Sequence, residues 1–164
     1  MIIENTIKDV SSILHVINDA AIKYKGMIPD DCWHEPYMLE EDLINEFDNR
    51  LRMFGYLKSN ELVGVMGIQE LKDVTLIRHA YTLTNYQKMG IGQSMLLHLF
   101  KLNKSSHLFV GTWQDASWAI QFYEKFGFIR QSKKQTSILL NQYWEISSKQ
   151  IENSVVLEKC IPLQ

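Results

Sequence analysis

The feature that most constrains the fold is a predicted strand, residues 74–83, that leads into two closely spaced glycines, Gly90 and Gly92, and then directly into a predicted helix. Glycine lets the backbone adopt positive φ and lets N–H groups point outward without a Cβ in the way. These N–H groups would lie at a helix N-terminus, where the helix dipole favours an anion. The segment is therefore suited to hold phosphate. A tight strand-to-helix turn without a ligand is the alternative, and a Gly-x-Gly pair alone does not decide between them.

The rest of the chain predicts an alternation of strands and helices, which is typical of a mixed α/β fold. We expect strands at residues 1–4, 54–58, 61–71, 74–83, 108–113 and 154–158, another that begins at 128–131, and helices at about 7–26, 39–53, 93–102 and 116–126. Thr6 with Asp9 resembles a helix N-terminal cap, and Ser59-Asn60 is typical of a hairpin turn. The 164 residues contain no internal repeat or linker, which indicates one domain spanning 1–164.

Composition excludes several classes of protein. The 17 Lys and Arg residues against 19 Asp and Glu give a net charge of -2, whereas a dedicated nucleic-acid binder usually carries a basic excess. No apolar run approaches the roughly 18 residues of a membrane span, and the first residues lack the basic and apolar segments of a signal peptide. Cys32 and Cys160 are too few for a disulfide framework and are interpreted as reduced. We therefore expect a cytoplasmic protein with neither nucleic acid nor a membrane as its partner.

The net charge conceals a segregation along the chain. Residues 26–49 contain eight acids and no Lys or Arg, whereas residues 88–134 contain seven bases and two acids. Two solvated surfaces would explain this pattern without any ligand. A basic segment that also carries an anion site would suit a phosphorylated ligand instead.

A second motif, Ala-x-x-Phe-Tyr-x-x-x-Gly-Phe, occupies residues 119–128 and places Gly127 35 residues after Gly92. The two motifs, in this order and spacing and with the surrounding strands and helices, resemble the GNAT superfamily of acyl-CoA-dependent N-acyltransferases. The resemblance covers most of the chain. It implies a GNAT-like α/β fold with a central, mostly antiparallel twisted sheet of six or seven strands, flanked by about four helices.

In this superfamily the glycine-containing segment binds the pyrophosphate of coenzyme A, so the resemblance implies acetyl-CoA as cosubstrate. The backbone groups of Thr82, Leu83 and Thr84 would contact the pantetheine arm, whose amides would extend the sheet. Gln87 would order the loop, and Ser94 would donate a hydroxyl. The backbone amides that would hold the pyrophosphate are those of Lys88, Met89, Gly90, Ile91, Gly92 and Gln93.

The resemblance also implies that Tyr123 protonates the departing thiolate as a general acid. A phenol has a pKa of about 10, close to that of a thiol, so the two groups can share a proton. A buried aromatic residue on a helix face is the alternative for Tyr123 taken alone. Family members commonly carry an asparagine seven residues before this tyrosine, where this chain has Ala116. Asp115 is adjacent and could substitute, although a carboxylate is a poorer donor.

Attack by an amine on the thioester requires that the amine lose a proton and that the tetrahedral oxyanion be stabilised. A backbone N–H near Thr82, where the strand ends, is the simplest donor to the oxyanion. His79 is one candidate for the base, because an unperturbed histidine pKa of about 6.5 suits neutral pH. A hydrogen-bonded strand histidine without a catalytic role is at least as good an interpretation. Glu70 is the second candidate, although a carboxylate at a hairpin end is more often only solvated.

The acceptor is expected to bind to the first half of the chain, where Trp33, Glu35 and Tyr37 lie in an acidic loop between or beside two prolines. Carboxylates and aromatic faces suit a cationic amine. Trp113 could line the same cleft. The alternative is that the aromatic residues of the loop anchor it to the core. The remaining histidines show no metal-ligand spacing, so no metal site is expected.

The resemblance predicts an N-acetyltransferase that moves the acetyl group of acetyl-CoA to a primary amine of a small molecule or peptide, by direct attack in a ternary complex. A non-catalytic acyl-CoA-binding regulatory module and an unrelated phosphate-binding α/β protein are the alternatives. The sequence identifies neither the acceptor nor the acyl chain length. In proteins of this resemblance a C-terminal strand often mediates pairing, so a homodimer is also open.

Overall fold

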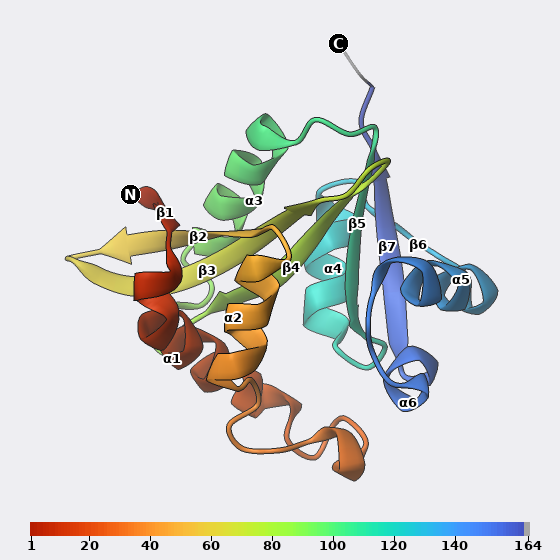
Figure 1. The fold of residues 1–164 in the computed structure, drawn as a ribbon, viewed down its shortest axis with the longest axis horizontal. Helices are drawn as coiled ribbons and strands as arrows, with labels where there is room; N and C mark the ends of the chain where they lie inside the picture. Colours follow the sequence, from red (N-terminus) through yellow and green to blue (C-terminus); the bar gives the residue numbers. More distant parts are fainter. Residues whose placement is uncertain (163–164) are drawn as a thin grey trace.

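A twisted seven-stranded sheet forms the centre of the computed structural model, which describes residues 1–162 (Figure 1). Its strand order is β1-β2-β3-β4-β5-β7-β6, and every neighbouring pair is antiparallel except β4 with β5. The strands are β1 (Ile2–Asn5), β2 (Leu51–Lys58), β3 (Glu61–Glu70), β4 (Thr75–Thr82), β5 (His107–Trp113), β6 (Ile129–Arg130) and β7 (Ser154–Cys160). The predicted fold class is therefore confirmed. The last two residues of the predicted domain, Leu163 and Gln164, lie outside the described residues.

Six α-helices accompany the sheet within residues 1–162, two more than the sequence predicts. They are α1 (Val10–Ala21), α2 (Glu40–Asp48), α3 (Ile91–Leu102), α4 (Ser117–Lys125), α5 (Lys133–Tyr143) and α6 (Ser148–Glu152). Figure 1 shows α1 and α2 together on one side of strands β2 to β4 and α3 on the other, while α5 and α6 lie beside β7. The additional helices are α5 and α6, in the tail. Within the described range no helix combines the length and apolar character that a bilayer crossing demands.

The predicted helix at 39–53 is wrong at its C-terminal end, because α2 stops at Asp48 and β2 begins at Leu51. Arg50 has a φ of 67°, a left-handed conformation that does not continue a helix. Leu51 and Met53 are buried in the sheet. Residues two apart share a face of a strand, so apolar residues that seem to extend a helical period fit a strand equally well.

The turn signals in the sequence lie where the chain changes direction. Ser59 and Asn60 both have positive φ, 51° and 65°, and join β2 to β3 as the predicted hairpin turn. Thr6 and Asp9 form a complete capping box, which confirms the predicted cap. The cap leads into α1 through the 3₁₀ turn Ile7–Asp9. Within residues 1–162 the other 3₁₀ turns are Ile22–Tyr24, Asp30–Cys32 and Thr84–Tyr86.

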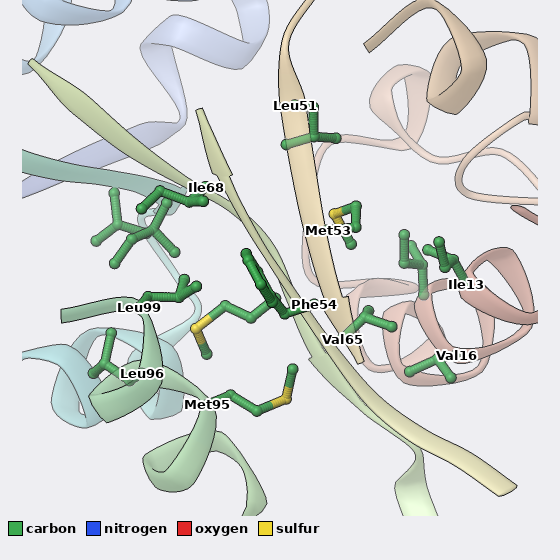
Figure 2. Close-up of a cluster of buried hydrophobic side chains, with 14 of the residues drawn as sticks. Ile13, Val16, Leu51, Met53, Phe54, Val65, Ile68, Met95, Leu96 and Leu99 are labelled. Carbon is green, nitrogen blue, oxygen red and sulfur yellow. The ribbon is translucent and has the colours of Figure 1, made fainter. Parts of the chain in front are cut away.

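Apolar side chains cover both faces of the sheet (Figure 2). Met53 of β2 points toward Ile13 of α1, whereas the next residue, Phe54, points to the opposite face, where Met95 of α3 lies. Both strand residues are almost fully buried, and burying a side chain of this size contributes about 1.5–3 kcal/mol. This packing on both faces holds α3 against the sheet. The glycine loop, which lies at the N-terminus of α3, is thereby held in place.

Candidate active site

The sheet splits open between β4 and β5. These parallel strands pair only over Thr75–Ile77 and Leu108–Val110, although β4 continues to Thr82 and β5 to Trp113. Beyond the paired segment, the edges that face each other have backbone N–H and C=O groups without ladder partners. An amide-bearing ligand can pair with such an edge as an added strand would. The split therefore offers a binding edge inside the sheet.

A cleft of about 710 Å³ occupies this split, a volume typical of small-molecule and cofactor sites. The free end of β4, residues 78–82, lines it together with Gly111 and Thr112 of β5. The glycine loop and the first turn of α3 line it as well, and so does α4 through residues such as Phe122 and Tyr123. The two motifs of the sequence therefore meet at one cavity.

The glycine loop has the predicted positive φ at Gly90 but not at Gly92, which lies in α3. Lys88 and Gly90 have left-handed φ values of 62° and 79°. The Nε2 group of Gln87 donates a hydrogen bond to the carbonyl of Thr82 at 3.1 Å, which ties the loop to the end of β4. The N–H of Ser94 donates to the carbonyl of Gly90 at 3.0 Å and begins the helical ladder, so the N–H groups before it in α3 are left for an anion.

The structure brings most, but not all, of the predicted coenzyme-binding residues to the cleft. Those that line it are Thr82, Gln87, Lys88, Gly90, Ile91, Gly92 and Gln93. Leu83 is buried in the core, and Met89 is exposed away from the cleft. The N–H of Thr84 already donates to Asp19 Oδ2 at 2.7 Å. The hydroxyl of Ser94 donates to the carbonyl of Gly90 at 3.1 Å, so it is also engaged.

Tyr123 lies in α4 and lines the cleft, although only 4% of its surface is exposed. The rings of Phe122 and Phe128 pack against it, with centroid distances of 5.1 and 5.3 Å, and fix its orientation. Burial, with a smaller contribution from the phenol of Tyr24, raises the pKa of Tyr123 above its ordinary value. The phenol therefore keeps its proton at neutral pH, but it is a weaker acid than the free phenol on which the expected match to a thiol pKa was based.

Ala116 stands where the family pattern has an asparagine, and it is fully buried at the start of α4. Asp115 is exposed and does not line the cleft, so its side chain does not replace the asparagine. Its backbone carbonyl accepts a hydrogen bond from the N–H of Ser117 at 2.9 Å. Neither residue supplies the polar side chain that the family pattern places on this wall.

His79 lies at a bulge in β4, where the pairing with β3 shifts and where its φ of 50° departs from the strand conformation. A bulge changes the direction in which a side chain points, because the regular alternation between the two faces of the strand is interrupted there. His79 lines the cleft, and its Nε2 atom forms a hydrogen bond with Oε2 of Glu46 in α2. Glu70, the second predicted candidate for the base, does not line the cleft, and its Oε1 atom is buried without a hydrogen-bond partner among the described residues.

Glu46 is a cleft-side neighbour of His79 that the sequence did not single out as a candidate. Its carboxylate contacts His79 and also Nη2 of Arg78, at 3.2 Å. Burial alone would raise the pKa of Glu46, but the hydrogen bond to His79 and the charges of His79 and Arg78 hold that pKa below its ordinary value. The ionised carboxylate favours a proton on Nε2 of His79, which leaves Nδ1 as the basic nitrogen. No local signal marks Glu46, because it lies 33 residues from His79.

Two of the predicted acceptor residues come together. The indole N–H of Trp113 donates to the hydroxyl of Tyr37 at 2.9 Å, and both line a side pocket of about 140 Å³. This pocket shares Tyr24 and Tyr81 with the main cleft, where Trp118 stacks on Tyr24 at 6.0 Å. Burial raises the pKa of Tyr24 to about 12, so its phenol stays neutral. The pocket is therefore aromatic and uncharged.

The structure does not bring Trp33 or Glu35 to the cleft or to the side pocket. Trp33 stacks on Tyr37 with a centroid distance of 5.8 Å. Glu35 accepts a hydrogen bond from Nζ of Lys25 at 3.0 Å, and both side chains are more than half exposed. This placement agrees with the alternative in which aromatic residues anchor the loop.

A mixed sheet that splits between two parallel strands, beside a glycine loop that begins a helix, is the architecture of a GNAT-type acetyltransferase. A family model described as the acetyltransferase (GNAT) family matches residues 16–128, which is more than half of the chain. The chain belongs to this family. No curated protein matches it in sequence.

Solved structures of low sequence identity share the fold. The chain is similar to PaiA N-acetyltransferase from Thermoplasma acidophilum in complex with coenzyme A, with a TM-score of 0.75 and 18% identity over 98% of each chain. It is similar to the ribosomal-protein-S18-alanine N-acetyltransferase from Escherichia coli, with a TM-score of 0.72 and 16% identity over 100% of this chain and 95% of that chain. A GNAT family acetyltransferase from Staphylococcus aureus Mu50 gives a TM-score of 0.74 and 15% identity over 98% of each chain.

Proposed function

We propose that the protein transfers the acetyl group of acetyl-CoA to a primary amine of a small molecule or peptide, within one domain that spans residues 1–164. The observation that carries this proposal is the split between β4 and β5, which opens beside the glycine loop and is lined by both His79 and Tyr123. Membership of the acetyltransferase (GNAT) family supports acetyl transfer, and one structural neighbour is a complex with coenzyme A.

Coenzyme A would lie with its pantetheine arm along the free edge of β4, residues 78–82, where its amides would replace the missing strand partner. Its pyrophosphate would accept hydrogen bonds from the N–H groups of Ile91, Gly92 and Gln93 at the start of α3. Lys88 and Lys125 also line the cleft and supply positive charge for the phosphates. The backbone edge thus fixes the arm, and the helix N-terminus fixes the charged group.

The acceptor amine would attack the thioester carbonyl while both substrates are bound. Its nitrogen forms the new C–N bond, and its proton passes to Nδ1 of His79, directly or through water. Glu46 acts as a positioning residue, because its carboxylate holds the other ring nitrogen and stabilises the protonated ring. The C–S bond then breaks, and the hydroxyl of Tyr123 gives its proton to the departing thiolate sulfur.

The test of the general acid is Tyr123→Phe, which removes the phenolic proton and keeps the ring. General acid catalysis is typically worth about 10²–10⁴-fold in rate, so we expect kcat to fall by that order while acetyl-CoA still binds. Thiol release from acetyl-CoA in the presence of an amine is the readout. Tyr143→Phe is the matched control, because Tyr143 lies on α5 outside the cleft and donates to Asp73. Full activity of Tyr123→Phe at every pH would overturn this role.

Coenzyme binding is tested separately, by thermal unfolding with and without coenzyme A. A ligand of the folded state at 100 times its Kd stabilises by about 2.7 kcal/mol, so the midpoint should rise. If coenzyme A stabilises the protein but none of a panel of amines causes thiol release from acetyl-CoA, the non-catalytic acyl-CoA-binding module is favoured. Absence of stabilisation at saturating coenzyme A would contradict both functions.

The lining of the side pocket guides the choice of amines. We propose that Tyr37 and Trp113 contact the acceptor, since aromatic faces bind apolar groups and attract ammonium groups. The panel should therefore include amines carried on apolar or aromatic groups. One structural neighbour is a ribosomal-protein-S18-alanine N-acetyltransferase, so peptides with a free α-amine should be compared with small-molecule amines.

A further inference from the structure

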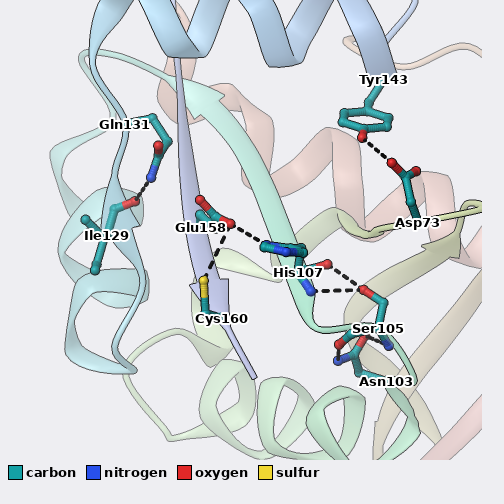
Figure 3. Close-up of polar contacts among 9 residues, drawn as sticks. All are labelled: Asp73, Asn103, Ser105, His107, Ile129, Gln131, Tyr143, Glu158 and Cys160. Carbon is teal, nitrogen blue, oxygen red and sulfur yellow. Dashed lines mark hydrogen bonds and ion pairs between the residues drawn. The ribbon is translucent and has the colours of Figure 1, made fainter. Parts of the chain in front are cut away.

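Away from the cleft, three side chains with metal-binding atoms meet on one face of the sheet: His107, Glu158 and Cys160 (Figure 3). His107 begins β5, and the other two lie at the end of β7. In the antiparallel register His107 pairs with Cys160, and Phe109 pairs with Glu158. Because residues two apart in a strand share a face, this register places all three side chains together.

One of the three separations between the ligand atoms matches a zinc site, a second is shorter, and the third is bounded at 4.8 Å. Nδ1 of His107 lies 2.7 Å from Oε1 of Glu158, and Sγ of Cys160 lies 3.6 Å from the same oxygen. All three atoms lie within 4.8 Å of one another. Ligands of a tetrahedral zinc ion, bound at about 2.0–2.3 Å, are roughly 3.4–3.7 Å apart. The Cys–Glu pair already fits, and the His–Glu pair would open by about 0.7 Å to match.

We propose that His107, Glu158 and Cys160 bind one Zn²⁺ ion, with water as the fourth ligand. Imidazole, thiolate and carboxylate are the ligands that zinc takes in proteins, whereas Mg²⁺ and Ca²⁺ prefer oxygen alone. His107 and Cys160 are exposed and Glu158 is half-buried, so an ion reaches the site from solvent.

The backbone that carries His107 is fixed before any ion binds. Its N–H donates to Oγ of Ser105 at 3.2 Å, and that hydroxyl donates to the carbonyl of His107 at 2.6 Å (Figure 3). Asn103 holds the same turn, because its Nδ2 group donates to the carbonyl of Ser105 at 2.7 Å. The other two ligands lie in β7, whose pairing with β5 runs the whole length of both strands.

The zinc site is separate from acetyl transfer and does not rest on the proposed function. None of its three residues lines the cleft. His107 lies three residues before Val110, which lines the cleft, and this spacing corresponds to roughly 10 Å along a strand. An ion at this position would join β5 to β7, so we expect it to raise the thermal midpoint and to leave the acetyl-transfer rate unchanged.

The experiment adds Zn²⁺ to the metal-free chain of residues 1–164 in a calorimetric titration, and Co²⁺ in a parallel titration followed by absorption. We expect one ion per chain and a thiolate-to-cobalt charge-transfer band. Cys160→Ser should weaken Zn²⁺ binding by more than about 100-fold, since loss of even an outer-shell partner costs 10–100-fold. Cys32→Ser is the matched control, because Cys32 is the other free cysteine and lies outside the cluster.

Equal Zn²⁺ binding by Cys160→Ser and Cys32→Ser would overturn the proposal. A cobalt complex without the thiolate band, or a stoichiometry other than one ion per chain, would also overturn it. His107→Gln provides a second test of the same ligand set, and it should lose Zn²⁺ binding to a similar extent. Thermal unfolding of each variant without metal shows whether it is folded, and the titrations are interpreted for the folded variants.

Discussion

Replacing Gly90 with alanine should separate backbone strain from coenzyme binding. Gly90 has a φ of 79°, and a Cβ atom built on it would meet nothing within 4 Å. In the protein without ligand, the substitution therefore penalises only the backbone conformation. A left-handed L-residue costs about 1–2 kcal/mol, and the reduced freedom of alanine in the unfolded chain returns about 0.4–1 kcal/mol. The net loss should be about 1 kcal/mol.

The conformation of the loop in the free protein decides whether this strain lowers the stability or weakens coenzyme binding. If the loop keeps its conformation in the free protein, the free energy of unfolding falls by the full amount and the Kd for coenzyme A does not change. If the free loop relaxes, stability is retained, and binding must restore the strained conformation. A strain of about 1–2 kcal/mol would then raise Kd by about 5- to 30-fold. Urea unfolding and calorimetric titration with coenzyme A measure the two losses, whose sum should match the net loss of about 1 kcal/mol.

Two other glycines serve as controls. Gly26 has a φ of 77° with nothing within 4 Å of a built Cβ, and it does not line the cleft, so Gly26→Ala should lose stability without weakening coenzyme A. Gly92 lies in α3 outside the left-handed region, and its Cβ would be 3.5 Å from the ring of Phe122, an ordinary contact. Gly92→Ala should therefore gain up to about 0.5–1 kcal/mol. An unchanged Gly90→Ala, or equal weakening of binding by Gly26→Ala, would refute the reasoning.

Two contacts near the cleft give further expectations. The pKa of Glu46 is held below 4.5 in the folded protein, so its stabilisation is present above about pH 4.5 and is lost as the pH falls through the folded value. Urea unfolding between about pH 3 and pH 7 should show this loss in the wild type and a flatter profile in Glu46→Gln; parallel profiles would contradict it. Gly64→Ala would place a Cβ 2.7 Å from Cγ2 of Ile91, the first residue of α3. Overpacking costs about 1–3 kcal/mol, so the thermal midpoint should fall and coenzyme A should bind more weakly than to Gly92→Ala; unchanged values would contradict this.

The parts of the fold that could be predicted are those with local signals. The glycine loop and the helix that bears Tyr123 are short contiguous motifs, and both occur where expected. Helix α5 could not be predicted, because its buried face consists only of Thr136, Leu139 and Leu140, which is too little apolar periodicity to indicate a helix. A stronger signal was available for α6, since Ser147 forms a capping box with Gln150.

The parts of the site that could not be predicted depend on pairing between distant segments. Glu46 meets His79 only because α2 packs beside the bulge of β4, and no spacing within either segment encodes that contact. The proposed zinc ligands His107 and Cys160 are cross-strand partners, and the strand register that joins them is set by the whole sheet. A search for ligands at fixed spacing cannot find such a cluster.

The acidic loop that seemed suited to a cationic acceptor is partly neutralised by ion pairs. Asp31 pairs with Nζ of Lys149 at 2.8 Å, and Glu35 pairs with Lys25 at 3.0 Å. Exposed pairs of this kind contribute little to stability, but they reduce the net negative charge that the loop presents. The number of acidic residues in the sequence therefore overstates the negative charge that the loop presents to a ligand.

The cleft itself is lined by Lys23, Arg78, His79, Lys88 and Lys125 and, within the described part of the chain, by no Asp or Glu. This lining suits the phosphates of coenzyme A. It also bears on the acceptor, because neighbouring positive charge lowers the pKa of a bound ammonium group. The neutral amine is the form that attacks the thioester, so under the proposed function the cations that would hold the coenzyme would also favour the reactive form of the acceptor. Recognition of the acceptor would then fall to the uncharged aromatic side pocket rather than to the acidic loop.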